Sequence, residues 1–133
     1  MGFRWYRSIV VVVVILLGAL SVHGEEGLKI TEMVVTTKIV RGNPIDSVRR
    51  ISSTSVNALY CFTRTSGPGE ETVLKHVWYR NNEKVAESEL PIKGKRWRTY
   101  SKIGIDRQSP GQWRVEALDA GGSVIKKVEF RIN

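Results

Sequence analysis

The sequence predicts an all-β protein, a small antiparallel β-sandwich of the immunoglobulin-like kind, preceded by an N-terminal hydrophobic signal or anchor helix. Three observations predict this. From Leu28 onward apolar and polar residues alternate with a period of two, and Val, Ile, Thr, Trp and Tyr are frequent. Clusters of Gly, Pro, Asn and Asp interrupt this pattern at short intervals. A short uncharged apolar run comes before it.

The N-terminal segment has the layout of a secretory signal, with two arginines before the apolar run Ile9–Val22 and two glutamates after it. The run is shorter than the ~20 residues that span a bilayer core comfortably. We therefore expect a signal peptide or membrane anchor over residues 1–24 and one β-sandwich domain over residues 25–133. Cleavage near Gly24 is favoured, and the alternative is a retained membrane tether. Either outcome predicts an extracytoplasmic protein that is periplasmic, secreted or anchored in the inner membrane.

Turn-forming residues separate seven predicted strands, because Gly, Pro, Asn and Asp adopt the backbone angles that tight turns need. About seven short strands in roughly a hundred residues are typical of an antiparallel sandwich. No segment after residue 24 carries a sustained helical period. The segment 41–57 is the least regular, and we expect a long, flexible loop there. The strands are predicted at residues 29–40, 58–65, 73–80, 84–90, 96–103, 112–118 and 123–132.

The last two predicted strands make the clearest hairpin. Trp113, Val115 and Ala117 alternate with Arg114, Glu116 and Leu118. After the turn, apolar residues again alternate with charged ones. One apolar face and one charged face are typical of a half-buried antiparallel pair. Lys126 falls on the apolar register, so we expect that end of the strand to fray into solvent.

Charge and cysteine content exclude several kinds of partner and site. Removing residues 1–24 takes away Arg4 and Arg7, so the net charge falls from +8 to +6, which favours anionic partners. Nucleic acid is not expected, because an exported protein rarely meets it. The single cysteine, Cys61, rules out an internal disulfide. With His76 as the only histidine of the β region, the four ligands of a structural zinc site are missing, and we expect no metal and no cofactor.

Catalytic chemistry has few residues to work with. A serine triad would need His76 and a carboxylate, and no serine lies in a nucleophile-elbow motif. A dyad of Cys61 and His76 is conceivable, because a thiolate needs a nearby base or cation. Cys61 lies in the middle of a predicted strand, however, where a buried and inert thiol is the usual case. We therefore expect a non-enzyme.

A group of aromatic and basic residues forms the candidate binding site. Side chains two positions apart on a strand point the same way, so His76, Trp78 and Arg80 share one face of their strand. An exposed Trp or Tyr beside arginines can stack on sugar rings or bind acidic groups. The ordinary alternative is that the tryptophans pack in the core and the arginines form a solvated strand face. The candidate residues are His76, Trp78, Arg80, Arg96, Trp97, Arg98, Tyr100 and Arg114.

Four strings in the sequence resemble the bacterial domain of unknown function 2914 family. They are LYCFT at 59–63, HVWY at 76–79, WRTYS at 97–101 and GQWRVEALD at 111–119, in this order. The resemblance covers roughly residues 28–132. It implies an envelope-associated module, often attached to a membrane segment, with no established activity and no catalytic residues to transfer.

Three functions follow from these observations. The first is a non-catalytic extracytoplasmic binding module of the bacterial envelope, whose basic strand face around Arg80, Arg96 and Arg98 engages a protein or an anionic envelope polymer or glycan. The alternative is a carbohydrate-binding module that uses exposed Trp and Tyr. The third is a small Cys–His hydrolase. Solvent exposure of the tryptophans and of Cys61 distinguishes among them.

Overall fold

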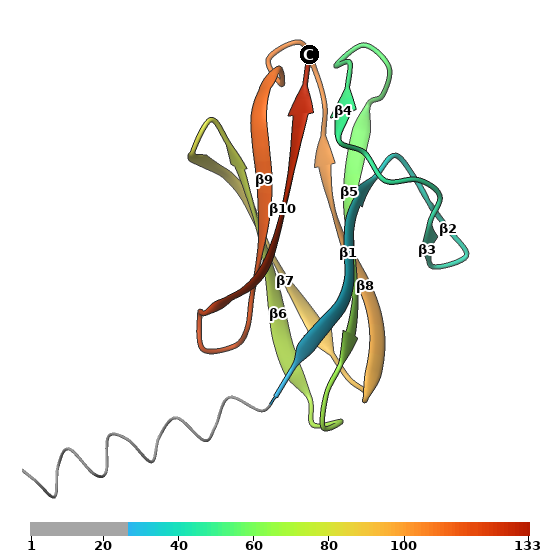
Figure 1. The fold of residues 1–133 in the computed structure, drawn as a ribbon, viewed down its shortest axis with the longest axis vertical. Helices are drawn as coiled ribbons and strands as arrows, with labels where there is room; N and C mark the ends of the chain where they lie inside the picture. Colours follow the sequence, from blue (N-terminus) through green and yellow to red (C-terminus); the bar gives the residue numbers. More distant parts are fainter. Residues whose placement is uncertain (1–26) are drawn as a thin grey trace, which may run out of the picture.

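The computed structural model describes residues 27–133 and shows two β-sheets that face each other (Figure 1). The predicted signal or anchor segment lies outside the described residues. Within 27–133 all regular structure is β, as predicted, and ten strands are present. This part of the chain contains no helix that is long and apolar enough to cross a membrane.

One sheet has three strands, in the order β1 (Lys29–Thr36), β5 (Ala58–Ser66) and β8 (Arg96–Gly104). Both neighbouring pairs in this sheet are antiparallel. The register places Arg64 of β5 directly opposite Arg98 of β8. This three-stranded sheet carries the candidate site described below.

The second sheet has five strands and packs against the first. Its first strand runs parallel to its neighbour, and the other pairs are antiparallel. The strand order is β4 (Arg50–Ile51), β10 (Val124–Ile132), β9 (Gly111–Leu118), β6 (Thr72–Arg80) and β7 (Glu83–Ile92). The predicted hairpin of the last two strands is confirmed by the antiparallel pairing of β9 with β10.

The region from residue 37 to residue 57 differs most from the prediction. The predicted strand 29–40 ends early, because β1 stops at Thr36 and the chain then forms a separate hairpin of β2 (Ile39–Val40) and β3 (Asn43–Pro44). The predicted long loop 41–57 is also wrong in part, since it contains β3 and the β4 strand that joins the second sheet. Strands of two residues are too short to produce a visible alternation in the sequence.

The prediction that the strand around Lys126 frays is wrong as well. A β-bulge between Val124 and Lys126 shifts the pairing of β10 with β9. A bulge inserts one extra residue into a strand and so changes which face its neighbours occupy. Lys126 is therefore exposed while Ile125 is half-buried, and β10 is paired from Val124 onward.

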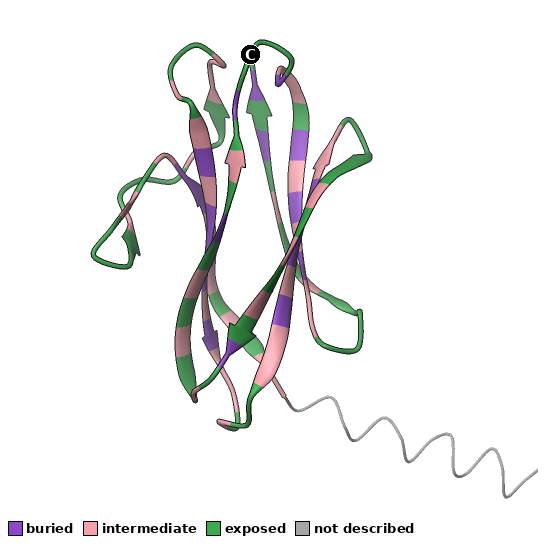
Figure 2. Cartoon of the chain, turned by 180° about the vertical axis from the view of Figure 1, so that it is seen from behind, coloured by how far each residue is buried: buried purple, intermediate pink, exposed green. Residues whose placement is uncertain are grey.

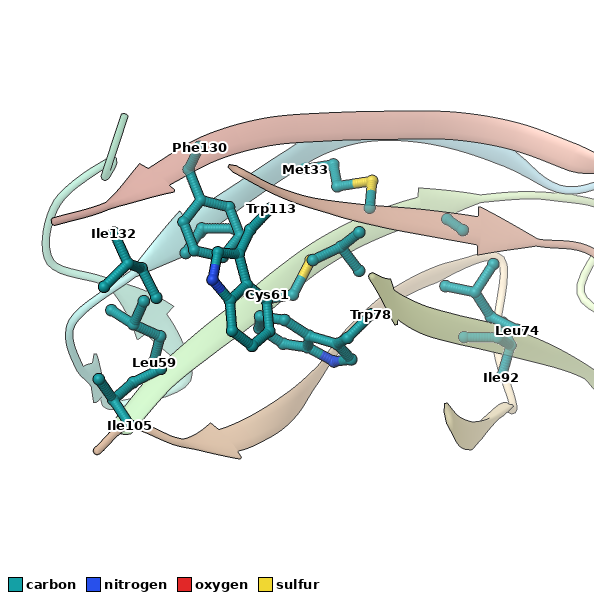
Figure 3. Close-up of a cluster of buried hydrophobic side chains, with 13 residues drawn as sticks. Met33, Leu59, Cys61, Leu74, Trp78, Ile92, Ile105, Trp113, Phe130 and Ile132 are labelled. Atoms are coloured by element: carbon teal, nitrogen blue, oxygen red, sulfur yellow. The ribbon is translucent and has the colours of Figure 1, made fainter. Parts of the chain in front are cut away.

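The core lies between the sheets, where buried residues alternate with exposed ones along the strands (Figure 2). The phenyl ring of Phe130 packs near two buried indole rings, those of Trp113 and Trp78 (Figure 3). Its centroid is 5.8 Å from that of Trp113, which is stacked on it, and 6.2 Å from that of Trp78, which meets it edge to face. Such contacts add to the free energy gained from burying the rings.

Candidate functional site

Alternation along β5 and β8 turns a set of basic side chains to the outer side of the three-stranded sheet. In β5, Leu59 and Cys61 are buried in the core, whereas Arg64 is half-exposed on the opposite face. In β8, Ser101 faces the core, whereas the adjacent residues Tyr100 and Lys102 are exposed. We call this surface the basic face and define it by Arg64, Arg96, Arg98 and Lys102.

The arginines of the basic face converge on one hollow. Arg64 lies opposite Arg98, and Ser66 lies opposite Arg96, so the three guanidinium groups come from two adjacent strands. The hollow has a volume of about 760 Å³, and its other lining residues are Thr31, Thr65, Ser66 and Trp97. Like charges directly opposite each other on neighbouring strands destabilise a sheet. The direct opposition of Arg64 and Arg98 is therefore expected to destabilise this pair of strands.

Acidic residues neutralise this face incompletely. In the described part of the chain, one ion pair lies on the three-stranded sheet, with Arg64 Nε 3.2 Å from Glu32 Oε1. The other four lie on the five-stranded sheet: Lys75–Glu89, Lys84–Glu87, Arg114–Glu116 and Lys127–Glu129. Within residues 27–133, neither Arg96 nor Arg98 has an ion-pair partner. The basic face therefore keeps a positive potential. On the five-stranded sheet, ion pairs neutralise most of the basic side chains on the outer face.

The β2–β3 hairpin covers part of the basic face and lies beside the three-stranded sheet (Figure 1). The Oδ1 atom of Asn43 accepts hydrogen bonds from Arg98 Nη1 at 3.0 Å and from Arg64 Nη2 at 3.4 Å. Phe62 is buried beneath this region, with the Arg64 guanidinium 5.5 Å from its ring centroid. A neutral amide oxygen thus lies between two positively charged groups.

Four of the predicted site residues lie around this face. Arg96, Arg98 and Tyr100 belong to β8 and are exposed, and Trp97 is half-buried where it lines the hollow. Tyr100 contacts Tyr60 edge to face, with ring centroids 5.8 Å apart and an angle of 74° between the ring planes. The two rings therefore do not make a common flat platform.

Arg80 and Arg114 lie on the other sheet, so the predicted grouping of Arg80 with Arg96 and Arg98 is not formed. Arg80 Nε donates a hydrogen bond to the carbonyl oxygen of Pro110 at 2.8 Å. The guanidinium of Arg114 stacks on Tyr79, 3.9 Å from its ring centroid, and also pairs with Glu116. Arg80 thus contacts the loop before β9 and Arg114 contacts residues of its own sheet, which is the ordinary structural role of such residues.

His76 and Trp78 are fully buried and do not reach a partner at the surface, which corrects their assignment as binding residues. Ser101 joins the two, since its Oγ lies 2.7 Å from His76 Nδ1 and accepts from Trp78 Nε1 at 3.0 Å. His76 Nε2 is 2.7 Å from Thr63 Oγ1. Burial lowers the pKa of His76 to about 4, so the ring is neutral in the folded domain at pH 7. The network satisfies buried polar groups in the core.

Cys61 is buried between the sheets, and burial raises the pKa of its thiol, against a smaller lowering by a hydrogen bond from Thr63. The thiolate is the reactive species, and it is disfavoured here. Among residues 27–133 no group of three or more His, Cys, Asp and Glu side chains is placed to hold a metal ion. The geometry does not supply the open cleft that a Cys61–His76 hydrolase requires.

We expect the Cys61 thiol to remain unmodified when the native domain is treated with iodoacetamide, and to react completely after unfolding in guanidinium chloride. Burial limits both the access of the reagent and the thiolate population. Mass spectrometry of the two samples measures this difference. Rapid modification of the native domain would show that the two sheets separate readily.

Sequence reasoning missed Arg64, which is central to the hollow. The sequence contained a signal for it, because Arg64 lies two residues after Phe62 in the predicted strand 58–65 and therefore shares a strand face with it. Its position opposite Arg98 depends on the pairing of β5 with β8, which are thirty residues apart in the chain. The hydrogen bonds of Asn43 could not be predicted either, because the pattern of residues 41–57 predicts a loop.

The two facing sheets, with the basic face on the outside of one, define an immunoglobulin-like β-sandwich. The crystal structure of an immunoglobulin-like protein from Pseudomonas aeruginosa is similar, with a TM-score of 0.55 and 11% identity, over 80% of this chain and 96% of that one. This likeness shows the fold alone. A β-glucosidase from Kluyveromyces marxianus aligns with a TM-score of 0.46 and 10% identity over 80% of this chain but 14% of its own, and supports no further conclusion.

A family model, described as Protein of unknown function (DUF2914), matches residues 71–132. Over that segment the chain is similar to this family, and the predicted resemblance is confirmed there. The match is shorter than the predicted range 28–132, and it includes three of the four strings but not LYCFT at 59–63. No curated protein matches the sequence.

Proposed function

We propose that this domain is a non-catalytic, extracytoplasmic binding module of the bacterial envelope that engages an anionic partner through the basic face. The observation that carries the proposal is the hollow lined by Arg64, Arg96 and Arg98. Its location outside the cytoplasm rests on the signal-like run Ile9–Val22 and is part of the same proposal.

The chemistry of the hollow suits an anion. A guanidinium group presents several N–H donors in a rigid fork that matches carboxylate and phosphate oxygens. Hydrogen bonds between ionised partners are roughly twice as strong as neutral ones. Ser66 adds to the lining a hydroxyl group that can donate to an oxygen atom of a ligand, whereas the Thr31 hydroxyl donates to the carbonyl oxygen of Arg64 at 3.2 Å. Bound anions would also relieve the repulsion between Arg64 and Arg98.

The carbohydrate-binding alternative has weaker support. Trp78 and Trp113 are buried, so they offer no stacking surface, and Trp97 is half-buried. Tyr100 is 47% exposed on the basic face, and this residue is the observation that favours a glycan. A single exposed ring set at a steep angle to Tyr60 does not form the coplanar platform that the alternative predicts.

Reversing one charge on the basic face tests the proposal. We expect Arg96→Glu to weaken binding to immobilised heparin, used as a general polyanion probe, by about tenfold at low salt, because the change replaces attraction by repulsion. The matched control is Arg131→Glu, which makes the same charge change on an exposed strand position of the other sheet. Elution over a sodium chloride gradient measures both variants.

Equal elution of Arg96→Glu and Arg131→Glu, both shifted from the unmodified domain, would mean that net charge alone governs binding and would contradict the proposed face. Retention of the domain on a neutral oligosaccharide column, lost in Tyr100→Ala, would favour the carbohydrate alternative instead. Binding through the basic face falls steeply with ionic strength, since surface charges are screened over about 10 Å at 0.1 M salt.

A further inference from the structure

We propose that Arg64 and Arg98 form an oxyanion subsite that the side-chain amide of Asn43 occupies in the unliganded domain. We infer that the ligand is a linear phosphate polymer, one phosphate of which takes the place of the Asn43 oxygen. This inference rests on the proposed function and names the ligand class for the same face. It depends on the contacts of Asn43, the electrostatics of the arginine pair and the position of Arg96.

The contacts show where an anionic oxygen would bind. Arg98 Nη1 and Arg64 Nη2 approach Asn43 Oδ1 from two neighbouring strands, at 3.0 and 3.4 Å. Glu32 contacts the Nε side of the Arg64 guanidinium and leaves its Nη2 group to Asn43. Two donors from different strands thus converge on one acceptor atom, which marks the centre of the subsite.

The electrostatics show why an anion would displace the amide. Asn43 is neutral, so it satisfies N–H donors without compensating either positive charge. A phosphate oxygen would accept the same hydrogen bonds in their stronger, charge-assisted form. It would also screen Arg64 from Arg98, whose direct opposition destabilises the unliganded sheet.

The hairpin that carries Asn43 is firmly attached at its base and lightly paired along its length. At the base, Asp46 Oδ1 accepts hydrogen bonds from Thr36 Oγ1 at 2.6 Å and from the Thr37 amide at 2.8 Å. Above the base, β2 and β3 pair over two residues each. A short ladder of this kind is a low-stability element that can shift locally while its anchor holds.

Arg96 explains why the ligand is a polymer of phosphates. It lies two residues from Arg98 on the same strand and faces the same hollow, so the two Cα atoms are about 7 Å apart. One oxygen of a phosphate can accept from Arg64 and Arg98 as Asn43 Oδ1 does, while its other oxygens continue the polymer chain toward the next phosphate. A second phosphate further along the chain would reach Arg96.

A matched pair of variants tests the occupancy by Asn43. Asn43→Asp places a carboxylate between Arg64 and Arg98, so we expect it to raise the thermal unfolding midpoint and to weaken binding of short-chain polyphosphate by about tenfold. Asn82→Asp is the control. Asn82 Oδ1 accepts from Arg114 Nη1 at 2.7 Å on the other sheet, and Asp tolerates its positive φ of 68°. Titration calorimetry measures both affinities.

The outcomes separate this inference from the proposed function. Asn43→Ala should bind polyphosphate at least as tightly as the unmodified domain, because it removes the occupant and keeps both arginines. Inorganic phosphate should bind more weakly than the polymer at equal ionic strength. If Arg98→Glu abolishes polyphosphate binding while Asn43→Asp matches Asn82→Asp, the subsite assignment is wrong and the basic face stands. If Arg98→Glu has no effect, both proposals fail.

Discussion

Replacing Trp78 with alanine is expected to lower the free energy of unfolding by about 4 kcal/mol, within the range found for deletion of buried tryptophan rings. The indole is fully buried and contacts the ring of Phe130 edge to face. Its removal would leave a cavity between the sheets. It would also remove the N–H group that donates a hydrogen bond to Ser101 Oγ. Both effects act on the native state, so the loss exceeds that of a typical substitution.

Chemical unfolding in urea, followed by tryptophan fluorescence or far-ultraviolet circular dichroism, measures this difference. Tyr100→Ala provides the control, because Tyr100 is half-exposed on the outer face, and we expect it to cost less than about 1 kcal/mol. Trp78→Phe should lie between the two, since it keeps a ring in the core. A loss below about 1.5 kcal/mol for Trp78→Ala would contradict the packing described above.

Acidification from pH 7 to pH 4 is expected to destabilise the domain through His76 by roughly 3 kcal/mol. The pKa of His76 is lowered by burial from 6.5 to about 4 in the folded state. The unfolded chain therefore takes up a proton below about pH 6.5, while the folded domain resists protonation down to about pH 4. Stability falls as the pH drops through this window, and the contribution of His76 levels off below it.

Urea unfolding at several pH values between 7 and 4 measures this dependence. The variant His76→Gln removes the titrating ring and keeps groups that can pair with Thr63 and Ser101, so its stability should vary less over the same range. Carboxylates such as Asp46 titrate in both proteins and cancel in the comparison. Parallel curves for the two proteins would show that folding does not lower the pKa of His76.

Much of the fold was predictable because seven of the strands are long enough to show an alternating pattern. The pattern around Trp113 and Val115 correctly identified the half-buried β9–β10 pair, and the burial of both residues confirms which face is inside. The hairpin of β2 and β3 was missed, since its pairing covers two residues on each side. The β10 bulge was missed because it changes the register without changing the composition.

The candidate site was predictable in part for the same reason. Alternation along residues 96–103 correctly separated Arg96 and Arg98 from the core-facing residues. It could not say which other strand lies next to them. Arg80 was therefore grouped with these arginines although it belongs to the other sheet, and Arg64 was left out although it lies opposite Arg98.

The sequence by itself determined the all-β character of residues 27–133, the inward side of the β9 strand and the lack of a second cysteine to form a disulfide. These properties depend on side-chain periodicity and composition, which are local. Only the tertiary structure decided that Arg64, Arg98 and Asn43 meet, and that His76 and Trp78 are buried together. Such meetings depend on strand order and register, which are set by the packing of segments far apart in the chain.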